Sequence, residues 1–392
     1  MRIGIVAFHL FRTNKHGMDI AALELIKSLV DLNLKHKFYI FSMGGPDDKI
    51  LDQIEGIKVI KMPDVPYPFA EQVILPFLAK FHKIDLLHCT SNTAPLLCRV
   101  PTVVTLHDVI FMEYNLSKYR SLYHKTANLY RKLIVPYAIK KAKKIITVSS
   151  TEVSSISKHF PETIDKLEVI PNAIAAHFYA SPELNESPDF ILPKRYIFFH
   201  GNGDPKKNLD GVLIAFASIV EEGKADFQLL LSELDDKNLN KTLQRLNLKH
   251  IRSYVIAAGY IPNKKLSKVY NKALIFLYPG IRESFGLPII EAMACGVPVI
   301  TSNRSALPET AGDAALYINP LDNSELKNAI LHLLENQELR ISLIQKGIQR
   351  ALVFKREFTA QQTITIYESV LKKELLKPLA ADKTQKITEV VS

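Results

Sequence analysis

Short apolar runs alternate with longer amphipathic stretches along most of the chain, and this alternation constrains the fold more than any other feature. The run IGIVAF at 3–8 predicts a buried strand, and residues 18–32 place apolar side chains at the spacing of one helix face. The apolar runs lack the in-and-out polarity of a half-solvated strand, so we expect parallel sheets covered by helices on both faces. Further strands are predicted at 38–41, 57–60, 84–88, 102–107, 144–148, 167–170, 196–199, 227–231, 253–258, 273–278, 297–301 and 314–318.

A proline-rich stretch divides this pattern in two. Residues 171–193 contain four prolines among Asn, Ser and Glu, which is typical of a linker. The chain has 392 residues, which is long for one core. We therefore expect an α/β protein with two doubly wound domains, at 1–178 and 194–353. Ligands of such folds lie beyond the carboxyl ends of the strands, so the loops that follow strands should hold the functional motifs.

Composition narrows the classes of protein and of site. The three cysteines are too few and too scattered for a disulfide framework or a zinc site, which favours a reducing compartment. No apolar run approaches the ~20 residues of a membrane-spanning helix. The formal net charge of +10 favours an anionic partner. Aromatic and basic residues are not interleaved as in proteins that stack nucleic acid bases, so we expect no nucleic acid partner.

The loop HGNGDPKKNLDG at 200–211 follows a predicted strand and resembles a seat for phosphate. A helix beginning near Lys206 or Lys207 would direct free backbone N–H groups at an anion, and the Lys207 ammonium would add a charge-assisted hydrogen bond. The spacing fits neither the dinucleotide-binding fingerprint nor the P-loop. An ordinary turn between a strand and a helix is the alternative interpretation.

The stretch RESFGLPIIEAMACGVPV at 282–299 places two glutamates around a predicted helix start. Pro288 suits the first turn of a helix, so Glu291 should lie in the first or second turn. There it could accept both hydroxyls of a ribose, while the loop amides at 284–287 meet a sugar or its phosphate. Alternatively, Glu291 only complements the helix dipole and Glu283 is a surface charge.

The segment ESFGLPIIEAMACGVPV resembles the signature of the retaining glycosyltransferases of family 4. These enzymes have the GT-B fold, in which two Rossmann-like domains face each other across a cleft that holds the active site. The resemblance extends from residue 1 to about residue 373 and continues, in order, through the segments at 103–111, 145–150, 169–174, 201–209, 258–262 and 305–320.

The resemblance implies roles for individual residues. Glu283 and His107 would lie beside the transferred sugar, and Lys207 would neutralise the diphosphate leaving group. Glu291 would bind the ribose of the nucleotide. The complete donor site implied by the resemblance consists of Gly201, Asn202, Lys206, Lys207, Tyr260, Ile261, Ser284, Phe285, Gly286, Leu287 and Glu291.

The resemblance also implies the domain roles. The N-terminal domain would bind the acceptor and the C-terminal domain the nucleotide-sugar donor, and a terminal helix at 354–373 would cross back to the first domain. At Asn202 the chain departs from the family, which often carries arginine there, so Lys206 would share the contact with the diphosphate.

The expected activity is transfer of a hexosyl or deoxyhexosyl group, with mannosyl favoured, to a glycan or lipid-linked saccharide in surface polysaccharide synthesis. The family typically needs no metal ion, and this chain has no D-x-D step to hold one, so no cofactor is expected. GDP-mannose is the favoured donor, ahead of UDP- and dTDP-sugars. A nucleotide-sugar epimerase or hydrolase on the same fold is the alternative function.

A basic stretch bears on the location of the protein. Residues 118–144 contain nine Lys or Arg and no Asp or Glu, with leucines and Tyr137 at helical spacing. A basic amphipathic helix of this kind can lie on anionic lipid, although a solvated face explains the pattern equally well. Pro136 should kink this helix. We expect a cytoplasmic protein, and under the first interpretation its N-terminal domain docks on the inner face of the cell membrane to reach a lipid-linked acceptor.

Overall fold

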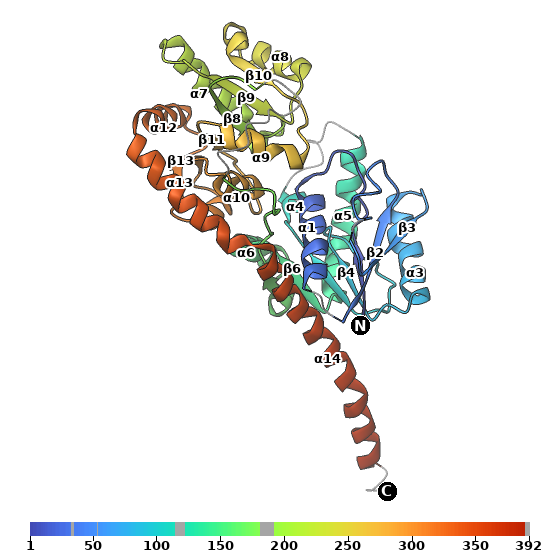
Figure 1. The fold of residues 1–392 in the computed structure, drawn as a ribbon. Coiled ribbons are helices and arrows are strands. Elements are labelled where there is room, and N and C mark those ends of the chain that lie inside the picture. The colour runs from blue at the N-terminus through green and yellow to red at the C-terminus, as the bar shows by residue number, and fades with distance from the viewer. Residues whose placement is uncertain (33–34, 53, 114–121, 181–191, 389–392) are drawn as a thin grey trace. The chain divides into compact units, whose positions relative to one another are not determined.

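The computed structural model describes the chain except for residues 33–34, 53, 114–121, 181–191 and 389–392 (Figure 1). The described chain forms two compact units. Unit 1 comprises Met1–Ala173 and Arg356–Ser392, and unit 2 comprises Ile174–Lys355. Within the expected linker, residues 181–191 lie outside the described residues. The Ile174 N–H donates to the Phe354 carbonyl, so the chain that follows residue 173 packs within unit 2.

Unit 1 contains one parallel sheet, in which the described residues form seven strands in the order β3-β2-β1-β4-β5-β6-β7. The strands are short apolar runs whose neighbouring residues are buried on opposite faces; Val103 packs on one face of the sheet and Val104 on the other. Their bounds are β1 (Arg2–Val6), β2 (Lys37–Met43), β3 (Ile57–Met62), β4 (Leu86–Cys89), β5 (Thr102–Thr105), β6 (Lys144–Thr147) and β7 (Leu167–Val169).

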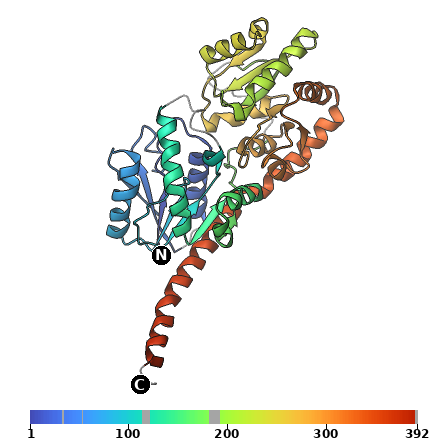
Figure 2. The same ribbon diagram turned by 180° about the vertical axis from the view of Figure 1, so that it is seen from behind.

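Helices cover both faces of this sheet. One face is covered by α1 and α14, and the other by α3 and α5, which is the helix in front of the sheet in Figure 2. The helical segments are α1 (Gly17–Asp31), α2 (Tyr67–Phe69), the π-helix η1 (Ala70–Ile74), α3 (Leu75–Phe81), α4 (Ile110–Glu113), α5 (Leu122–Lys141), α6 (Ser150–His159), the 3₁₀-helix η3 (Pro161–Lys166) and α14 (Arg356–Thr388).

Unit 2 repeats the plan with a parallel sheet in the order β10-β9-β8-β11-β12-β13. Its strands are β8 (Tyr196–His200), β9 (Gln228–Ser232), β10 (Val255–Ala257), β11 (Phe276–Tyr278), β12 (Val299–Ser302) and β13 (Ala315–Ile318). Its helices are α7 (Leu209–Glu221), α8 (Asp236–Arg245), α9 (Asn263–Lys272), α10 (Leu287–Ala294), α11 (Leu307–Ala311), α12 (Asn323–Glu335) and α13 (Gln337–Ala351), with 3₁₀ turns η4 (Pro205–Lys207), η5 (Lys249–Tyr254) and η6 (Leu352–Phe354).

The predicted class is confirmed, because each expected strand is present and both sheets are parallel. The predicted terminal helix at 354–373 is α14, which begins at Arg356 and returns to pack on α1 of unit 1. The Arg356 guanidinium lies 2.8 Å from an Asp31 carboxylate oxygen, which pairs the start of α14 with the end of α1.

A buried polar chain attaches α14 to the sheet of unit 1. The Tyr367 hydroxyl lies 2.6 Å from His88 Nδ1, and His88 Nε2 lies 2.7 Å from Thr105 Oγ1. Burial, with a smaller contribution from the nearby His107, lowers the pKa of His88 to about 3, so the ring is neutral at pH 7. A neutral imidazole has one donor and one acceptor nitrogen, and both are used here.

Replacing Tyr367 with phenylalanine should destabilise the protein, because His88 Nδ1 would be left buried without its hydroxyl partner. We expect a loss of about 1–3 kcal/mol in the free energy of unfolding, measured by urea denaturation. The control is Tyr137→Phe, at an exposed tyrosine of the same unit, which should change stability by less than about 0.5 kcal/mol. Equal stability of the two variants would contradict the role given to this hydroxyl.

Candidate functional site

The loop after β8 has a different backbone from the one the sequence predicts. The α-helix begins at Leu209, not near Lys206 or Lys207, and these two lysines lie in the 3₁₀ turn η4 before it. Asn208 separates the turn from α7 because its backbone is left-handed, with φ 64°. The expected helix start was therefore wrong by two or three residues.

The amides of this loop are also used differently from the expectation. The Lys206 N–H donates to Asp204 Oδ1 at 3.1 Å, and the Lys207 N–H donates to the Asp204 carbonyl at 2.9 Å. Asp204 in turn donates its N–H to Asn202 Oδ1 at 3.0 Å. These three amides serve the turn itself, so they are not free to bind an anion.

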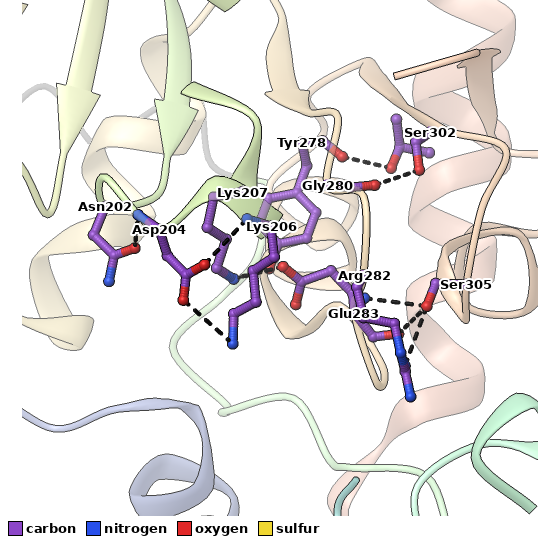
Figure 3. Close-up of polar contacts among 11 residues, drawn as sticks. Asn202, Asp204, Lys206, Lys207, Tyr278, Gly280, Arg282, Glu283, Ser302 and Ser305 are labelled. Atoms are coloured by element: carbon purple, nitrogen blue, oxygen red, sulfur yellow. Dashed lines mark hydrogen bonds and ion pairs between the residues drawn. The ribbon is translucent and has the colours of Figure 1, made fainter. Parts of the chain in front are cut away.

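The Lys207 ammonium joins the two sequence motifs (Figure 3). Its Nζ lies 2.8 Å from Glu283 Oε1 and 2.8 Å from the Tyr278 hydroxyl. Burial alone would lower the pKa of Lys207, but the Glu283 charge and the Tyr278 hydroxyl outweigh burial and raise it above its usual range. Lys207 is therefore a fixed cation at neutral pH.

Backbone contacts hold the two loops together around this pair. The Ile281 N–H donates to the Lys206 carbonyl at 2.7 Å. Ser305 Oγ accepts from the Glu283 N–H at 3.2 Å and lies 2.9 Å from the Glu283 carbonyl, to which it donates. Gly280 makes room for the side chain, since a Cβ there would lie 2.9 Å from Glu283 Cγ. Glu283 is thus placed by its backbone as well as by Lys207.

The second glutamate lies where the sequence predicts it. Helix α10 begins at Leu287 with Pro288 in its first turn, and Glu291 lies in the second turn, buried. Gly286, the N-cap, has φ 103°, which a residue with a side chain rarely adopts. The Tyr270 hydroxyl donates to Glu291 Oε2 at 3.2 Å and Asn263 Nδ2 donates to Oε1 at 3.4 Å. Both bonds are long for donors to a carboxylate.

The remaining predicted donor-site residues differ in exposure. Asn202 is exposed, and Lys206 Nζ lies 3.8 Å from Asp204 Oδ2. Ile261 is buried in the core of unit 2. The Phe285 carbonyl accepts from Thr310 Oγ1 at 2.5 Å, which attaches the loop to α11. The others are half-buried or buried along the same loops: Gly201, Tyr260, Ser284 and Leu287.

His107 belongs to unit 1, two residues beyond the end of β5. It is buried, its N–H donates to Asn92 Oδ1 at 2.7 Å, and Nε2 lies 2.9 Å from the Thr90 carbonyl, to which it can only donate. Burial lowers the pKa of His107, and the hydrogen bond to Thr90 opposes this shift only in part. His107 is one of the residues that line a small cavity in unit 1, together with His88, Thr105 and Thr359.

Three residues that support the site were not predicted. Tyr278 is the last residue of β11, and the rule that ligands lie beyond carboxyl ends of strands could have found it. Gly280 carries no sequence signal of its own, and Ser305 begins the segment 305–320 that carries the resemblance, but the role of each depends on contacts with Glu283.

The described residues lack two features that would bear on function. In the part of the chain that the structure describes, no three His, Cys, Asp or Glu side chains are grouped so that they could hold a metal ion. Among these same residues, no helix has both the length and the apolar character needed to cross a membrane.

Known proteins resemble both halves of the chain. The family model of glycosyltransferase family 4 matches residues 16–178, and that of the glycosyl transferases group 1 matches residues 181–350. The chain is 31% identical to O-antigen chain mannosyltransferase B of Escherichia coli over 59% of this chain and 62% of that protein. It is 28% identical to the O-antigen chain mannosyltransferase RfbU of Salmonella typhimurium over 69% of this chain and 71% of that protein.

The fold has solved counterparts. Sucrose-phosphate synthase from Thermosynechococcus elongatus superposes with a TM-score of 0.73 at 21% identity, over 95% of this chain and all of that one. This likeness concerns the fold alone and agrees with the predicted GT-B architecture. Because the two family models together match residues 16–178 and 181–350, the chain belongs to the group 1, family 4 glycosyltransferases.

Proposed function

We propose that the protein is a retaining transferase that moves a mannosyl group from GDP-mannose to a hydroxyl of a glycan or lipid-linked saccharide. The observation that carries this proposal is the position of the Lys207 ammonium, 2.8 Å from Glu283 Oε1 at the carboxyl ends of β8 and β11. The Lys207 ammonium would bind the diphosphate of the donor. The neighbouring Glu283 carboxylate would accept hydrogen bonds from the hydroxyls of the sugar. The mannosyl donor and the role in surface polysaccharide are supported by the two relatives, which are O-antigen chain mannosyltransferases.

In the proposed reaction, the bond between the anomeric carbon and the diphosphate oxygen breaks as the acceptor oxygen forms its bond to the same face of that carbon. The acceptor proton passes to the departing phosphate oxygen, so no further reactant is needed. Lys207 stabilises the charge that grows on this oxygen, which is where a preorganised cation lowers the barrier most. We therefore propose that transfer does not depend on a metal ion.

The other residues would orient the donor. Glu291 would accept the ribose hydroxyls, in place of its long bonds to Tyr270 and Asn263, and Tyr260 with Ile261 would border the base. His107 would contact the transferred sugar through Nδ1, since Nε2 is committed to the Thr90 carbonyl.

The acceptor and the location are part of the same proposal. We propose that unit 1 binds the acceptor in the cytoplasm, at the inner face of the cell membrane. The basic stretch 118–144 supports a membrane contact from residue 122 onwards, where α5 begins, while residues 118–121 lie outside the described residues.

Thermal unfolding of the protein with a panel of nucleotide sugars should identify the donor. A ligand at 100 times its Kd adds about 2.7 kcal/mol to stability, so the nucleotide sugar that binds most tightly raises the melting temperature most. We expect this ligand to be GDP-mannose, ahead of UDP- and dTDP-sugars. With that donor and an acceptor, NMR of the product should show the anomeric configuration of the donor. Inversion, or hydrolysis or epimerisation in place of transfer, would refute the proposed reaction.

The two glutamates should have separable effects. Glu291→Gln should weaken donor binding and raise the KM for the donor, because a neutral amide accepts ribose hydroxyls less strongly than a carboxylate. Glu283→Gln should mainly lower kcat, since this side chain would act on the sugar and hold Lys207. Glu338→Gln on α13 is the matched control. Wild-type kcat and KM in both site variants would remove the basis of the assignment.

A further inference from the structure

The helical segment 67–81, made of α2, η1 and α3, has an unpartnered apolar side. Phe69, Val73, Phe77 and Phe81 recur every four residues and are exposed, Phe77 at 66% and Phe81 at 68%. The opposite side of the segment packs on the sheet of unit 1 through residues such as Leu75. Large aromatic side chains in a continuous exposed row are unusual on a soluble surface and mark a binding face.

Helix α5 carries a second row. Leu129, Leu133 and Tyr137 also recur every four residues and are exposed, while Val135 and Ile139 on the other side pack on the same sheet face as the segment 67–81. The Pro136 that the sequence places here lies inside the helix.

The two helical segments are direct neighbours. The Tyr130 hydroxyl on α5 donates to Glu71 Oε2 at 2.6 Å, and Gln72 Nε2 donates to the Tyr130 oxygen at 2.9 Å. Both segments pack on the same face of the sheet, so the exposed side of each lies away from that face.

The loop at 94–101 joins the two rows. The Leu96 N–H donates to Gln72 Oε1 at 2.9 Å, and the Leu96 carbonyl accepts from the Lys141 ammonium. Leu97, the next residue, is 82% exposed. We call the exposed apolar residues of the two rows and this loop the apolar face: Phe69, Val73, Phe77, Phe81, Leu97, Leu129, Leu133 and Tyr137.

Within the segments that carry the apolar face, the exposed charges have one sign. Within 67–84, 94–101 and the described residues of 122–144, the only acidic residue is Glu71, which is buried and accepts hydrogen bonds from its neighbours. The exposed cations in these segments are Lys80, Lys83, Arg99, Lys140, Lys141 and Lys143. A second copy of this chain would bring like charges together, whereas a surface of anionic lipid would complement them.

We propose that the apolar face docks unit 1 on an anionic bilayer, with the phenylalanines of 67–81 entering the headgroup region and the surrounding cations binding lipid phosphate. The proposal extends the membrane contact of α5 to a second helix, which carries the larger aromatic side chains. The biological purpose of this docking rests on the proposed function. Docking itself requires neither a bound donor nor transfer of a sugar.

Co-sedimentation with vesicles tests the apolar part of the proposal. The full chain should bind vesicles of phosphatidylcholine with phosphatidylglycerol, and bind phosphatidylcholine alone much more weakly. The double variant Phe77→Ser, Phe81→Ser should lose roughly tenfold or more in vesicle affinity, because two aromatic side chains no longer leave water. Phe358→Ser, at a 61% exposed phenylalanine of α14, is the matched control and should bind as the wild type does.

The charge part has its own variants. Lys80→Glu with Lys140→Glu should weaken binding to the anionic vesicles, and raised salt should do the same, whereas Lys237→Glu with Lys241→Glu on α8 should not. No binding of the wild type at low salt would overturn the proposal, as would unchanged binding of the phenylalanine variant. A wild-type dimer in light scattering that the same variant dissociates would instead assign the face to a second copy.

Donor binding separates this proposal from the proposed function. The stabilisation of each vesicle variant by nucleotide sugar should equal that of the wild type, which also shows that the variants fold. Loss of vesicle binding with donor binding intact supports docking through the apolar face, and loss of both in the phenylalanine variant would contradict it.

Discussion

The ion pair between Lys207 and Glu283 is the interaction on which the proposed donor site of unit 2 depends. It joins the loop after β8 to the loop after β11, two strands that are neighbours in the sheet. An ammonium next to a carboxylate stays charged, and here the Tyr278 hydroxyl at 2.8 Å adds to the same effect. The pair therefore keeps a positive charge at the carboxyl ends of β8 and β11.

Neighbouring residues hold the Lys207–Glu283 pair in place. Gly280 leaves space for the Glu283 side chain. The Ser305 hydroxyl, just before α11, accepts a hydrogen bond from the Glu283 N–H. On the other side, the Lys206 carbonyl is bound by the Ile281 N–H. A cation placed in advance costs little reorganisation when charge develops, which is the main advantage of such a site in catalysis. In unit 1, a buried hydrogen bond between the Tyr367 hydroxyl and His88 attaches α14 to the sheet. Both ring nitrogens of His88 have a partner.

The sequence predicted the elements better than the loops. Buried strands such as β5 are recognisable because both faces need apolar residues, and the meeting of Lys207 with Glu283 follows from the common edge where parallel strands end. The predicted helix start after β8 was too early because Asn208 has a left-handed backbone, which delays the helix to Leu209. The residues around Asn208 do not predict this conformation. The apolar face at 67–81 went unnoticed since the segment is apolar on nearly all sides, so its periodicity does not tell exposed Phe77 from buried Leu75.

The most direct test of the central claim is the affinity of wild-type protein and Lys207→Met for a nucleoside diphosphate and the matching monophosphate, measured by calorimetry. A charge-assisted hydrogen bond contributes about 1.5–3 kcal/mol, so the variant should bind the diphosphate at least about tenfold more weakly while its affinity for the monophosphate changes little. If Lys207→Met binds both nucleotides as the wild type does, the ion pair is structural and Lys207 does not hold the leaving group.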